Sequence, residues 1–511
     1  MRTPQRVLAP LLAVGLVLTS SPSGAPAAAA QPVKPVIRFG VNRAAQNLDP
    51  VTQDTNADIW ALMQLYQQLV RVSVKGDGFE PDLAERWTTS ADGRTWTFFM
   101  RKNARFSTGD PVKASDAVWS LTRARDTKGP WQWALEPVED IAAKDDYTVV
   151  IRLKEPWAPF LADISLFSNS ILPEKVFKGA SPGEISNKPV GSGPYMLAEW
   201  KKGEELVLKA NPHYHEKGLP KTPELRIRYI PDDIRRLIAV QSGAVDGIDF
   251  PPFSRVAELK RDPKLEVQLN PSTQVAHLVL NIREAPLNNG KFRQALAYAT
   301  DRAAIVKAVC FGHCTPATTF LPQATPFFNK GAKGYGYDLN RAKQLLKESG
   351  VAPPVTLKLL VRSNDAVHQP TAVALKEMWG KLDVTLELEP LERPTQRHRA
   401  NQFQVYLTSW SNDIPDPSQL AAYELGFTES QSYQSGYQSA EMDALLARGL
   451  RELDTRKRRQ IYDDIQDRAL RDSPLIWLYY APYSLALSQK MKGFAQMATG
   501  PWIFKHASVS P

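Results

Sequence analysis

Cys310 and Cys314, the two cysteines of the chain, stand four residues apart with His313 between them. Gly312 can bend the backbone there, so the two Cα atoms can come within the ~4.4–6.8 Å that a disulfide allows. A Cys–His–Cys metal site is the alternative, but no further ligand lies nearby in the sequence. Because the chain begins with an export signal, described below, an oxidising compartment favours a disulfide between Cys310 and Cys314.

Two other groups of residues could do chemistry, and both are incomplete. Gly179-Ala180-Ser181-Pro182-Gly183 matches the G-x-S-x-G turn of serine hydrolases. The residue after the serine must donate its N–H to an oxyanion, and Pro182 has none. His213 and His215 lack further histidine or cysteine neighbours and follow a turn. We therefore expect no catalytic residues, no metal and no cofactor, and a secreted hydrolase stays only as the alternative class.

The composition is that of a globular binding protein or enzyme. The 511 residues are 43% hydrophobic and 23% charged, which is ordinary for a folded chain and long enough for about three domains. Two cysteines exclude a disulfide-built scaffold. The net charge of +9 is dispersed, and the basic run Arg456–Arg459 stands between acidic residues. That pattern predicts a solvated helix face, so we expect no nucleic-acid partner.

Residues 1–30 have the organisation of a secretion signal. Arg2 and Arg6 precede a 13-residue apolar run from Val7 to Thr19, which is too short to span a bilayer. Small residues follow and end in Ala28-Ala29-Ala30, which fits an A-x-A cleavage site. No cysteine is present there for lipid attachment. We expect a periplasmic protein that is released by cleavage and is not a lipoprotein.

The rest of the chain alternates strand and helix patterns, which predicts an α/β fold with several lobes. The order strand, helix, strand around Val355–Leu388 indicates a βαβ unit with parallel strands. Helical patterns cover Phe292–Val309 and Ala440–Leu470, and further strands are expected at Gln274–Asn281 and Gln404–Leu407.

Many short segments, in order, resemble the large solute-binding proteins of bacterial peptide and nickel importers, the extracellular solute-binding family 5. The opening Asn47-Leu48-Asp49-Pro50 is similar to the family's "LDP", and Val190–Tyr195 (VGSGPY) to its "VGTGPY". The other segments that carry the resemblance are Pro81–Trp87, Thr95–Arg101, Phe106–Ala117, Asn211–Tyr214, Arg293–Ala295, Ala299–Arg302, Tyr437–Leu446 and Pro474–Tyr480. Together they cover nearly the whole mature chain.

The resemblance implies a bilobal periplasmic-binding-protein fold, type II and similar to the large cluster C members, with an extra domain inserted in the first lobe. Lobe I would comprise residues 32–52, the inserted domain 53–185, and residues 186–272 and 482–511. Lobe II would comprise residues 273–481. Such a protein closes around a solute between its lobes and delivers it to an inner-membrane ABC permease. We expect a monomer that binds a di- or oligopeptide. A nickel or metal chelate, an opine or an oligosaccharide are the alternative solutes.

The resemblance also implies site residues. Peptide binders of the family hold the ligand ammonium with an aspartate that corresponds to Asp413, in the segment Trp410–Pro417. A carboxylate in a closed cleft gives a charge-assisted hydrogen bond, but a turn-capping role for Asp413 is the alternative. Dipeptide binders hold the carboxylate with an arginine that corresponds to Arg362. His368 lies in the same loop as a further candidate contact, and Trp410 is expected to form a wall of the pocket.

Overall fold

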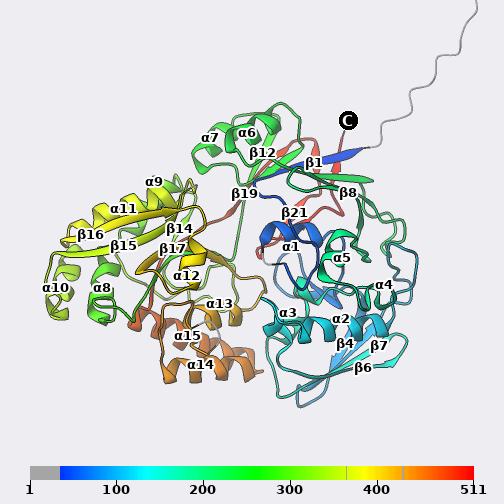
Figure 1. Ribbon diagram of the computed structural model, residues 1–511, viewed down its shortest axis with the longest axis horizontal. Helices are drawn as coiled ribbons and strands as arrows, with labels where there is room; N and C mark the ends of the chain where they lie inside the picture. The colour runs from blue at the N-terminus through cyan, green and yellow to red at the C-terminus, as the bar shows by residue number, and fades with distance from the viewer. Residues whose placement is uncertain (1–34, 54, 364, 429–430, 511) are drawn as a thin grey trace, which may run out of the picture. The chain divides into compact units, whose positions relative to one another are not determined.

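The computed structural model describes residues 35–53, 55–363, 365–428 and 431–510. The expected signal segment, residues 1–30, lies outside the described residues. In the described part of the chain, two lobes are each organised around one large β-sheet (Figure 1). None of the helices that the structure describes is long and apolar enough to cross a membrane.

The first lobe contains a seven-stranded sheet in which strands from both ends of the chain lie side by side. β1 pairs in parallel with β10 and β11, and β19 pairs antiparallel with β11 and β12. In spatial order the strands are β12 (Leu265–Asn270), β19 (Tyr483–Ser488), β11 (Gly247–Asp249), β1 (Val36–Val41), β10 (Glu224–Tyr229), β9 (Glu205–Ala210) and β8 (Tyr195–Lys201). Alternate side chains pack on opposite faces, because successive strand residues point to opposite sides. Phe39 thus lies in the core on one face and Ile248 in the core on the other.

A six-stranded sheet organises the second lobe. Its strands, in spatial order, are β14 (Thr315–Pro316), β18 (Leu475–Tyr480), β13 (Gln274–Leu280), β17 (Val405–Ser411), β15 (Val355–Arg362) and β16 (Val384–Leu391). β15 and β16 are parallel, with Val355 opposite Val384, which confirms the predicted βαβ unit. Helices cover both faces, since Leu359 and Leu360 belong to the cores on opposite sides of the sheet.

A separate four-stranded antiparallel sheet is formed by strands between Ala84 and Leu153. Its order is β4 (Ala84–Thr89), β5 (Thr95–Met100), β7 (Thr148–Leu153) and β6 (Val138–Asp145).

The α-helices of the described residues are α1 (Asn56–Leu62), α2 (Ala114–Asp126), α3 (Phe160–Ile164), α4 (Glu174–Phe177), α5 (Pro182–Asn187), α6 (Asp233–Gln241), α7 (Val256–Leu259), α8 (Gly290–Ala299), α9 (Arg302–Val309), α10 (Leu339–Ser349), α11 (His368–Gly380), α12 (Pro394–Arg399), α13 (Ser418–Leu425), α14 (Ala440–Arg451) and α15 (Thr455–Asp472). The 3-10 turns are η1 (Gln132–Leu135), η2 (Phe167–Asn169) and η3 (Phe253–Arg255). Short strands are β2 (Val70–Val72), β3 (Phe79–Pro81), β20 (Met491–Lys492), β21 (Ala495–Gln496), β22 (Trp502–Ile503) and β23 (Ser508–Val509).

Two helical patterns of the sequence are each divided in the structure. Residues 292–309 form α8 and α9, and residues 440–470 form α14 and α15. The second helix of each pair begins after an aspartate whose carboxylate accepts backbone N–H groups, Asp301 in α9 and Asp454 in α15. Such N-caps satisfy donors that a continuous helix would have bonded internally, and so start a new helix.

Two extended segments connect the large sheets. One runs from β12 into β13 and the other from β18 into β19, and Ser272 Oγ donates to the carbonyl of Ala481 between them. A second contact between the lobes lies at α14, where Arg451 forms an ion pair with Glu155 at 2.6 Å. Two adjacent crossing segments are the arrangement about which hinge closure takes place.

Candidate functional site

The loop that carries Asp413 is tied to the crossing segments between the two sheets. It connects β17 to α13, and its first residue, Asn412, is fully buried. Thr273 Oγ1 donates to the Asn412 carbonyl at 2.8 Å, and Asn412 Nδ2 donates to the Ile414 carbonyl at 2.9 Å. Ile414 is buried in the core of the first lobe. The loop is therefore held from both sheets.

Asp416 has a structural role in this loop. Its carboxylate forms two bonds with the Arg458 guanidinium, at 2.5 and 2.8 Å, and accepts the N–H of Ser418 at 2.9 Å. Both charged side chains are more than nine-tenths buried. A bidentate pair of this kind fixes geometry as well as charge, so Asp416 is committed to holding the loop on α15.

Asp413, three residues earlier, has no such partner. Asp413 Oδ2 accepts from Gln419 Nε2 at 2.7 Å, and its own N–H donates to Gln419 Oε1 at 2.7 Å. Within the described ranges, no cation forms an ion pair with the Asp413 carboxylate and no backbone N–H is capped by it. Burial raises its pKa to about 7, and the Gln419 hydrogen bond opposes the rise. Without a counter-charge, burial disfavours the ionised form of this carboxylate.

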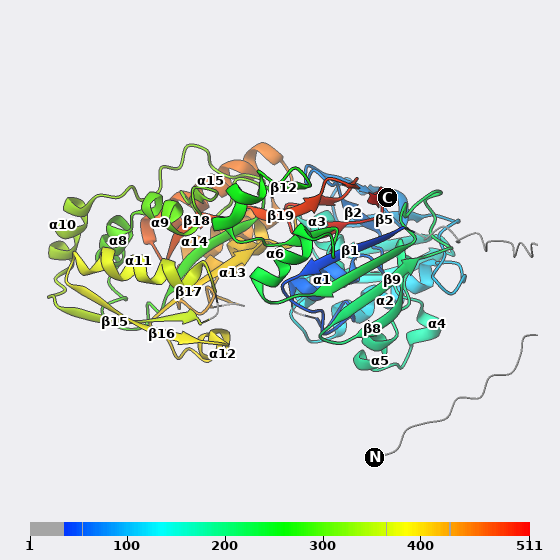
Figure 2. The same ribbon diagram turned by 90° about the horizontal axis from the view of Figure 1, so that it is seen from above.

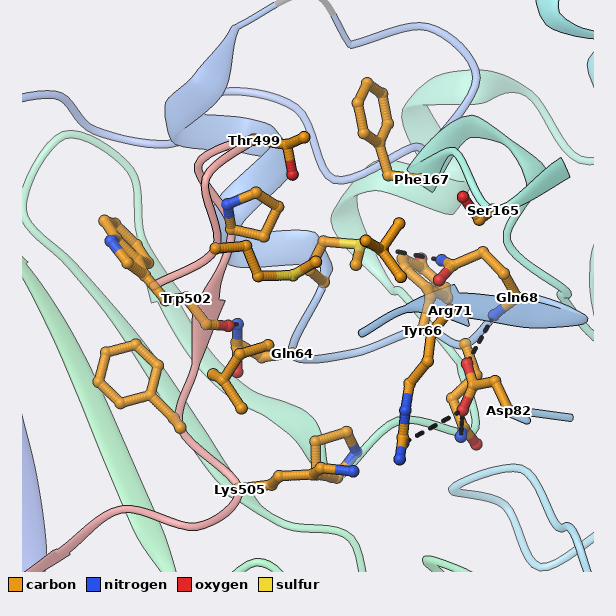
Figure 3. A pocket seen from close by; sticks show the side chains of 18 of the residues that line it. Gln64, Tyr66, Gln68, Arg71, Asp82, Ser165, Phe167, Thr499, Trp502 and Lys505 are labelled. Carbon is orange, nitrogen blue, oxygen red and sulfur yellow. Dashed lines mark hydrogen bonds and ion pairs between the residues drawn. The ribbon is translucent and has the colours of Figure 1, made fainter. Parts of the chain in front are cut away.

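Asp413 lines a pocket of about 90 Å³ whose other walls come from the first lobe. Figure 3 shows this pocket from close by. This volume exceeds the space of several water molecules. The apolar lining consists of Met63, Tyr66, Val72, Leu166, Phe167, Pro194, Met497, Pro501, Trp502, Ile503 and Phe504. The polar lining consists of Gln64, Gln67, Gln68, Arg71, Asp82, Ser165, Tyr214, Thr499 and Lys505. An apolar pocket with a few placed polar groups is the usual form of a small-molecule site.

Two tight turns position this lining. Gly191 and Gly193, from the VGSGPY motif, approach the backbone of Leu65 so closely that an added Cβ would lie 2.1 and 2.5 Å from it. The N–H of Gly193 donates to the Leu65 carbonyl at 2.9 Å. On the opposite wall, Gly500 has a φ of +113° and lies against Trp60, where a Cβ would clash at 2.7 Å. The motif thus shapes the pocket through the backbone.

One end of the pocket is a network of charged groups, several of which Figure 3 labels. Lys505 Nζ lies 2.7 Å and Arg71 Nη1 3.0 Å from the Glu216 carboxylate. Burial is the largest single influence on the pKa of Glu216 and would raise it. The hydrogen bonds from Lys505, Tyr214 and Arg71 together outweigh burial and lower this pKa to about 2. Burial raises the pKa of Asp82 to about 6. These charges compensate one another, whereas among the described residues no cation forms an ion pair with Asp413.

Arg362 lies on β15, the strand beside β17, and His368 lies on the helix that follows β15; neither residue lines this pocket. Arg362 is the last residue of β15, and its Nη1 donates to the Glu392 carbonyl at 3.2 Å. His368 begins α11, with its Nδ1 3.3 Å from Asp365 Oδ2. Burial lowers the pKa of His368, which keeps the imidazole neutral near pH 7. The structure brings these two predicted residues together around Asp365, one strand away from Asp413.

Trp410, on β17, packs within the second lobe. Its ring stacks on Tyr423 at a centroid distance of 4.8 Å and meets Tyr433 edge-on at 5.3 Å. It is half-buried and supports the end of β17 before the Asp413 loop. It is not part of the lining of the pocket that contains Asp413.

A buried acid–imidazole pair lies behind this loop, on α13. Glu424 Oε2 accepts from Trp477 Nε1 at 2.6 Å, and Glu424 Oε1 lies 3.4 Å from His277 Nδ1. Burial raises the pKa of Glu424 to about 8 and lowers the pKa of His277 to about 3. Both groups are therefore neutral at pH 7, and the pair is part of the core.

The sequence analysis missed the glutamines of the pocket wall. Gln64, Gln67 and Gln68 are almost fully buried, and Gln64 Nε2 donates to the carbonyls of Trp60 and Trp502. Three glutamines within the otherwise apolar run Met63–Val70 were the available signal, since buried amides need partners.

The other chemical groups of the sequence have structural explanations. Cys310 and Cys314 are joined by a disulfide with Cα atoms 5.6 Å apart. Ser181 is the N-cap of α5 in a capping box with Glu184, so its hydroxyl is used in helix capping. Burial lowers the pKa of His215 to about 4. In the described part of the chain, no group of three or more His, Cys, Asp or Glu residues could hold a metal ion.

Comparison with known proteins gives the family. The model of the bacterial extracellular solute-binding proteins, family 5, matches residues 78–431. The probable D,D-dipeptide-binding periplasmic protein DdpA of Escherichia coli K12 is 30% identical over 485 residues, covering 92% of this chain and 93% of the relative. Heme-binding protein A of Haemophilus influenzae is 29% identical over 476 residues, covering 87% of each chain.

A solved structure agrees in fold. The periplasmic binding protein DppA from Helicobacter pylori, in complex with the peptide STSA, has a TM-score of 0.84 at 24% identity, covering 93% of this chain and 98% of its own. This likeness concerns the fold alone, a bilobal α/β binding protein. The family match and the identity to DdpA go further, and this chain belongs to family 5 of the bacterial extracellular solute-binding proteins.

Proposed function

We propose that this protein captures a short peptide with a free amino terminus between its two lobes and delivers it to an ABC permease in the inner membrane. The observation that carries the proposal is the Asp413 carboxylate, which lines a pocket beside the crossing segments and has no counter-cation in the described structure. A ligand ammonium would supply that charge and a strong hydrogen bond.

Peptide length follows from the strand register. β15 and β17 are parallel neighbours, with Leu360 opposite Tyr406, so Arg362 lies at the level of Thr408. β17 ends at Ser411, three residues beyond Thr408, so the strand separates the level of Arg362 from the start of the Asp413 loop by about 10 Å. An extended peptide of two to four residues spans about 7–14 Å. We therefore propose a short peptide, with Asp413 toward its amino end and Arg362 toward its carboxyl end.

The relatives support this class of ligand without fixing it. DdpA is named for D,D-dipeptides, another relative from Escherichia coli is a dipeptide-binding protein, and a third relative is named for heme. We propose that the chain is a monomeric periplasmic carrier without enzymatic activity, that its mature form begins near Gln31 without lipid, and that its lobes divide as expected from the sequence.

Calorimetric titration of the purified mature protein tests the proposal. The ligands are L-Ala-L-Ala, D-Ala-D-Ala, tetra-alanine and N-acetylated dialanine, with heme as a separate absorbance titration. Binding of at least one free peptide, and at least tenfold weaker binding of its acetylated form, supports the proposal. Binding of heme alone, or equal binding of free and acetylated peptides, overturns it. Mass spectrometry of small molecules released from the native protein then identifies the amino-acid side chains of the bound peptide.

A further inference from the structure

Gln419, the second residue of α13, is a buried glutamine whose amide is bonded to Asp413 twice. Its Oε1 accepts from the backbone N–H of Asp413 and its Nε2 donates to Asp413 Oδ2, both at 2.7 Å. The residue is 3% exposed, and among the described residues its amide has no other hydrogen-bond partner. A buried amide needs partners for its oxygen and for its nitrogen. Here one residue supplies both, so Gln419 is committed to Asp413.

The helix that carries Gln419 is anchored at both of its ends. In Figure 2, as in Figure 1, α13 lies at the edge of the second lobe that is nearest to the first lobe. At its start, Asp416 Oδ1 accepts the N–H of Ser418 at 2.9 Å. In its last turn, Glu424 Oε2 accepts from Trp477 Nε1 at 2.6 Å. The amide of Gln419 therefore has a fixed position against the loop that precedes α13.

Gln419 orients the Asp413 carboxylate without cancelling its charge, because an amide is a neutral donor. Only Oδ2 of Asp413 accepts a hydrogen bond from a residue that the structure describes, although the residue lines the pocket. At Asp416, by contrast, the Arg458 guanidinium engages both carboxylate oxygens and neutralises the charge. Asp413 therefore keeps its Oδ1 and its negative charge for a ligand.

The ionisation of Asp413 depends on few of its described neighbours. Burial raises its pKa to about 7, and the hydrogen bond from Gln419 opposes this rise. In the same loop, Asp416 is paired with Arg458 of α15. Tyr483 on β19 is a neutral phenol near pH 7, because burial and, to a smaller extent, the Asp413 charge raise its pKa. The charged residues of the pocket lining are Arg71, Asp82 and Lys505.

We propose that Gln419 is a positioning residue for the ligand, because it fixes the Asp413 carboxylate at the pocket, favours its ionised form and leaves Oδ1 to the ligand ammonium. The inference rests on the proposed function and adds a residue that is not itself in the pocket lining. A hydrogen bond to the charged form of a group favours that form. Peptide binding should therefore extend to lower pH than it would without Gln419.

The test replaces the amide by two side chains of similar size. Gln419→Met removes the donor and the acceptor, whereas Gln419→Glu keeps an acceptor and, when protonated, also a donor. L-Ala-L-Ala and D-Ala-D-Ala are titrated calorimetrically into wild type and both variants at pH 6 and pH 8. Gln466→Met is the matched control, since Gln466 is also buried and its Nε2 donates to the carbonyls of Phe327 and Tyr462.

The two variants should change the pH dependence in opposite directions. In Gln419→Met the pKa of Asp413 should rise, so the loss of affinity should be at least about threefold greater at pH 6 than at pH 8. In Gln419→Glu the two adjacent carboxyl groups share one proton, and the protonated acid is a stronger donor than the amide. Its affinity relative to wild type should therefore be higher at pH 6 than at pH 8. Gln466→Met should change the affinity by the same factor at both pH values.

Two results would overturn the inference. One is a loss of affinity in Gln419→Met that is equal at both pH values, and the other is a change in the same direction in both Gln419 variants. Either would show that Gln419 supports the loop and has no effect on the charge of Asp413. If peptides bind both variants as they bind wild type, the proposed function stands and the inference fails.

A measurement without peptide separates the inference from the proposed function. Carbon-13 NMR of the aspartate carboxyl groups follows the titration of Asp413 in the ligand-free protein, with its signal assigned by Asp413→Asn. If no peptide binds wild type, the proposed function fails, and the NMR titration decides on Gln419. A titration of Asp413 that moves to higher pH in Gln419→Met, or to lower pH in Gln419→Glu should the first variant not fold, supports its effect on the carboxylate. An unchanged titration refutes it.

Discussion

Replacement of Asp413 by asparagine removes one charge and keeps the shape of the side chain. The amide oxygen that replaces the carboxylate can still accept from Gln419 Nε2, and the backbone bond to Gln419 Oε1 is unaffected. The substitution therefore isolates the charge, which is the feature on which the proposed function depends. It should have opposite effects on stability and on peptide binding.

Stability of the ligand-free protein should increase, and more so at higher pH. The pKa of Asp413 is raised from 3.8 to about 7, so the folded protein is increasingly penalised between these values as the unfolded chain ionises first. The upper bound is about 4 kcal/mol, at 1.36 kcal/mol per pKa unit. Because the side chain is only half-buried, solvent reduces this to about 1–3 kcal/mol. The difference between variant and wild type should be near zero at pH 4 and largest above pH 7.

Peptide affinity should fall. The variant leaves the ligand ammonium in the closed site without its counter-charge, which costs about 2–5 kcal/mol, or roughly 30-fold to several thousand-fold in Kd. In wild type, affinity should rise as pH increases toward 7, because Asp413 must be ionised to pair with the ammonium. It should fall again above about pH 8, where the peptide amino group loses its proton.

Calorimetry and thermal unfolding of both proteins between pH 5 and 9 measure these effects. The N-acetylated peptide is the matched ligand control, since it has no ammonium and should be insensitive to the substitution. Unchanged affinity for the free peptide, together with a lower unfolding temperature of the variant at every pH, would show that Asp413 serves the loop and not the ligand. A pH-independent gain in stability would contradict the assigned cause of the raised pKa.

Three further predictions concern the surroundings of the site. Asp416→Asn should lower the free energy of unfolding by about 3–5 kcal/mol, because it leaves the Arg458 guanidinium buried without its partner. Urea unfolding measures this loss, and a loss below about 1 kcal/mol would contradict the prediction. Glu424→Gln should raise the unfolding temperature more at pH 8 than at pH 5. The pKa of Glu424 near 8 makes the folded protein progressively less stable as pH rises from about 4.5 to 8, and the substitution removes this penalty. A temperature difference that is the same at both pH values would contradict the raised pKa of Glu424. Thiol titration of the denatured, unreduced protein should find no free sulfhydryl, and two would show that Cys310 and Cys314 are not joined.

Local sequence patterns predicted those parts of the fold that depend on local forces. The strands at 355–361 and 384–388 are β15 and β16, and their separation by a helical pattern correctly required parallel pairing. Periodicity alone did not divide residues 292–309 or 440–470. In both segments an aspartate can either continue one helix or cap the start of a second one. Which of the two forms is visible only once the directions of the two helices are known.

The site was less predictable because the role of each charged side chain depends on the partner that it meets in the tertiary structure. Asp413 and Asp416 occupy equivalent-looking positions around two prolines, and nothing in their local sequence distinguishes them. The difference is Arg458, 42 residues further along, which neutralises Asp416 only.

The distribution of unpaired charge is the strongest link between this structure and its function. The fold provides partners for buried charges such as Asp49 and Asp416, so the lack of a cation at Asp413 among the residues that the structure describes is not forced by a shortage of basic residues. An unpaired charge near a closing interface destabilises the closed state until a ligand of opposite charge arrives. Under the proposed function, with Asp413 toward one end of the ligand and Arg362 toward the other, closure is favoured by a zwitterion of matching length. Neutral or singly charged solutes of the same size would leave at least one of these groups desolvated and unpaired, and would be rejected for that reason.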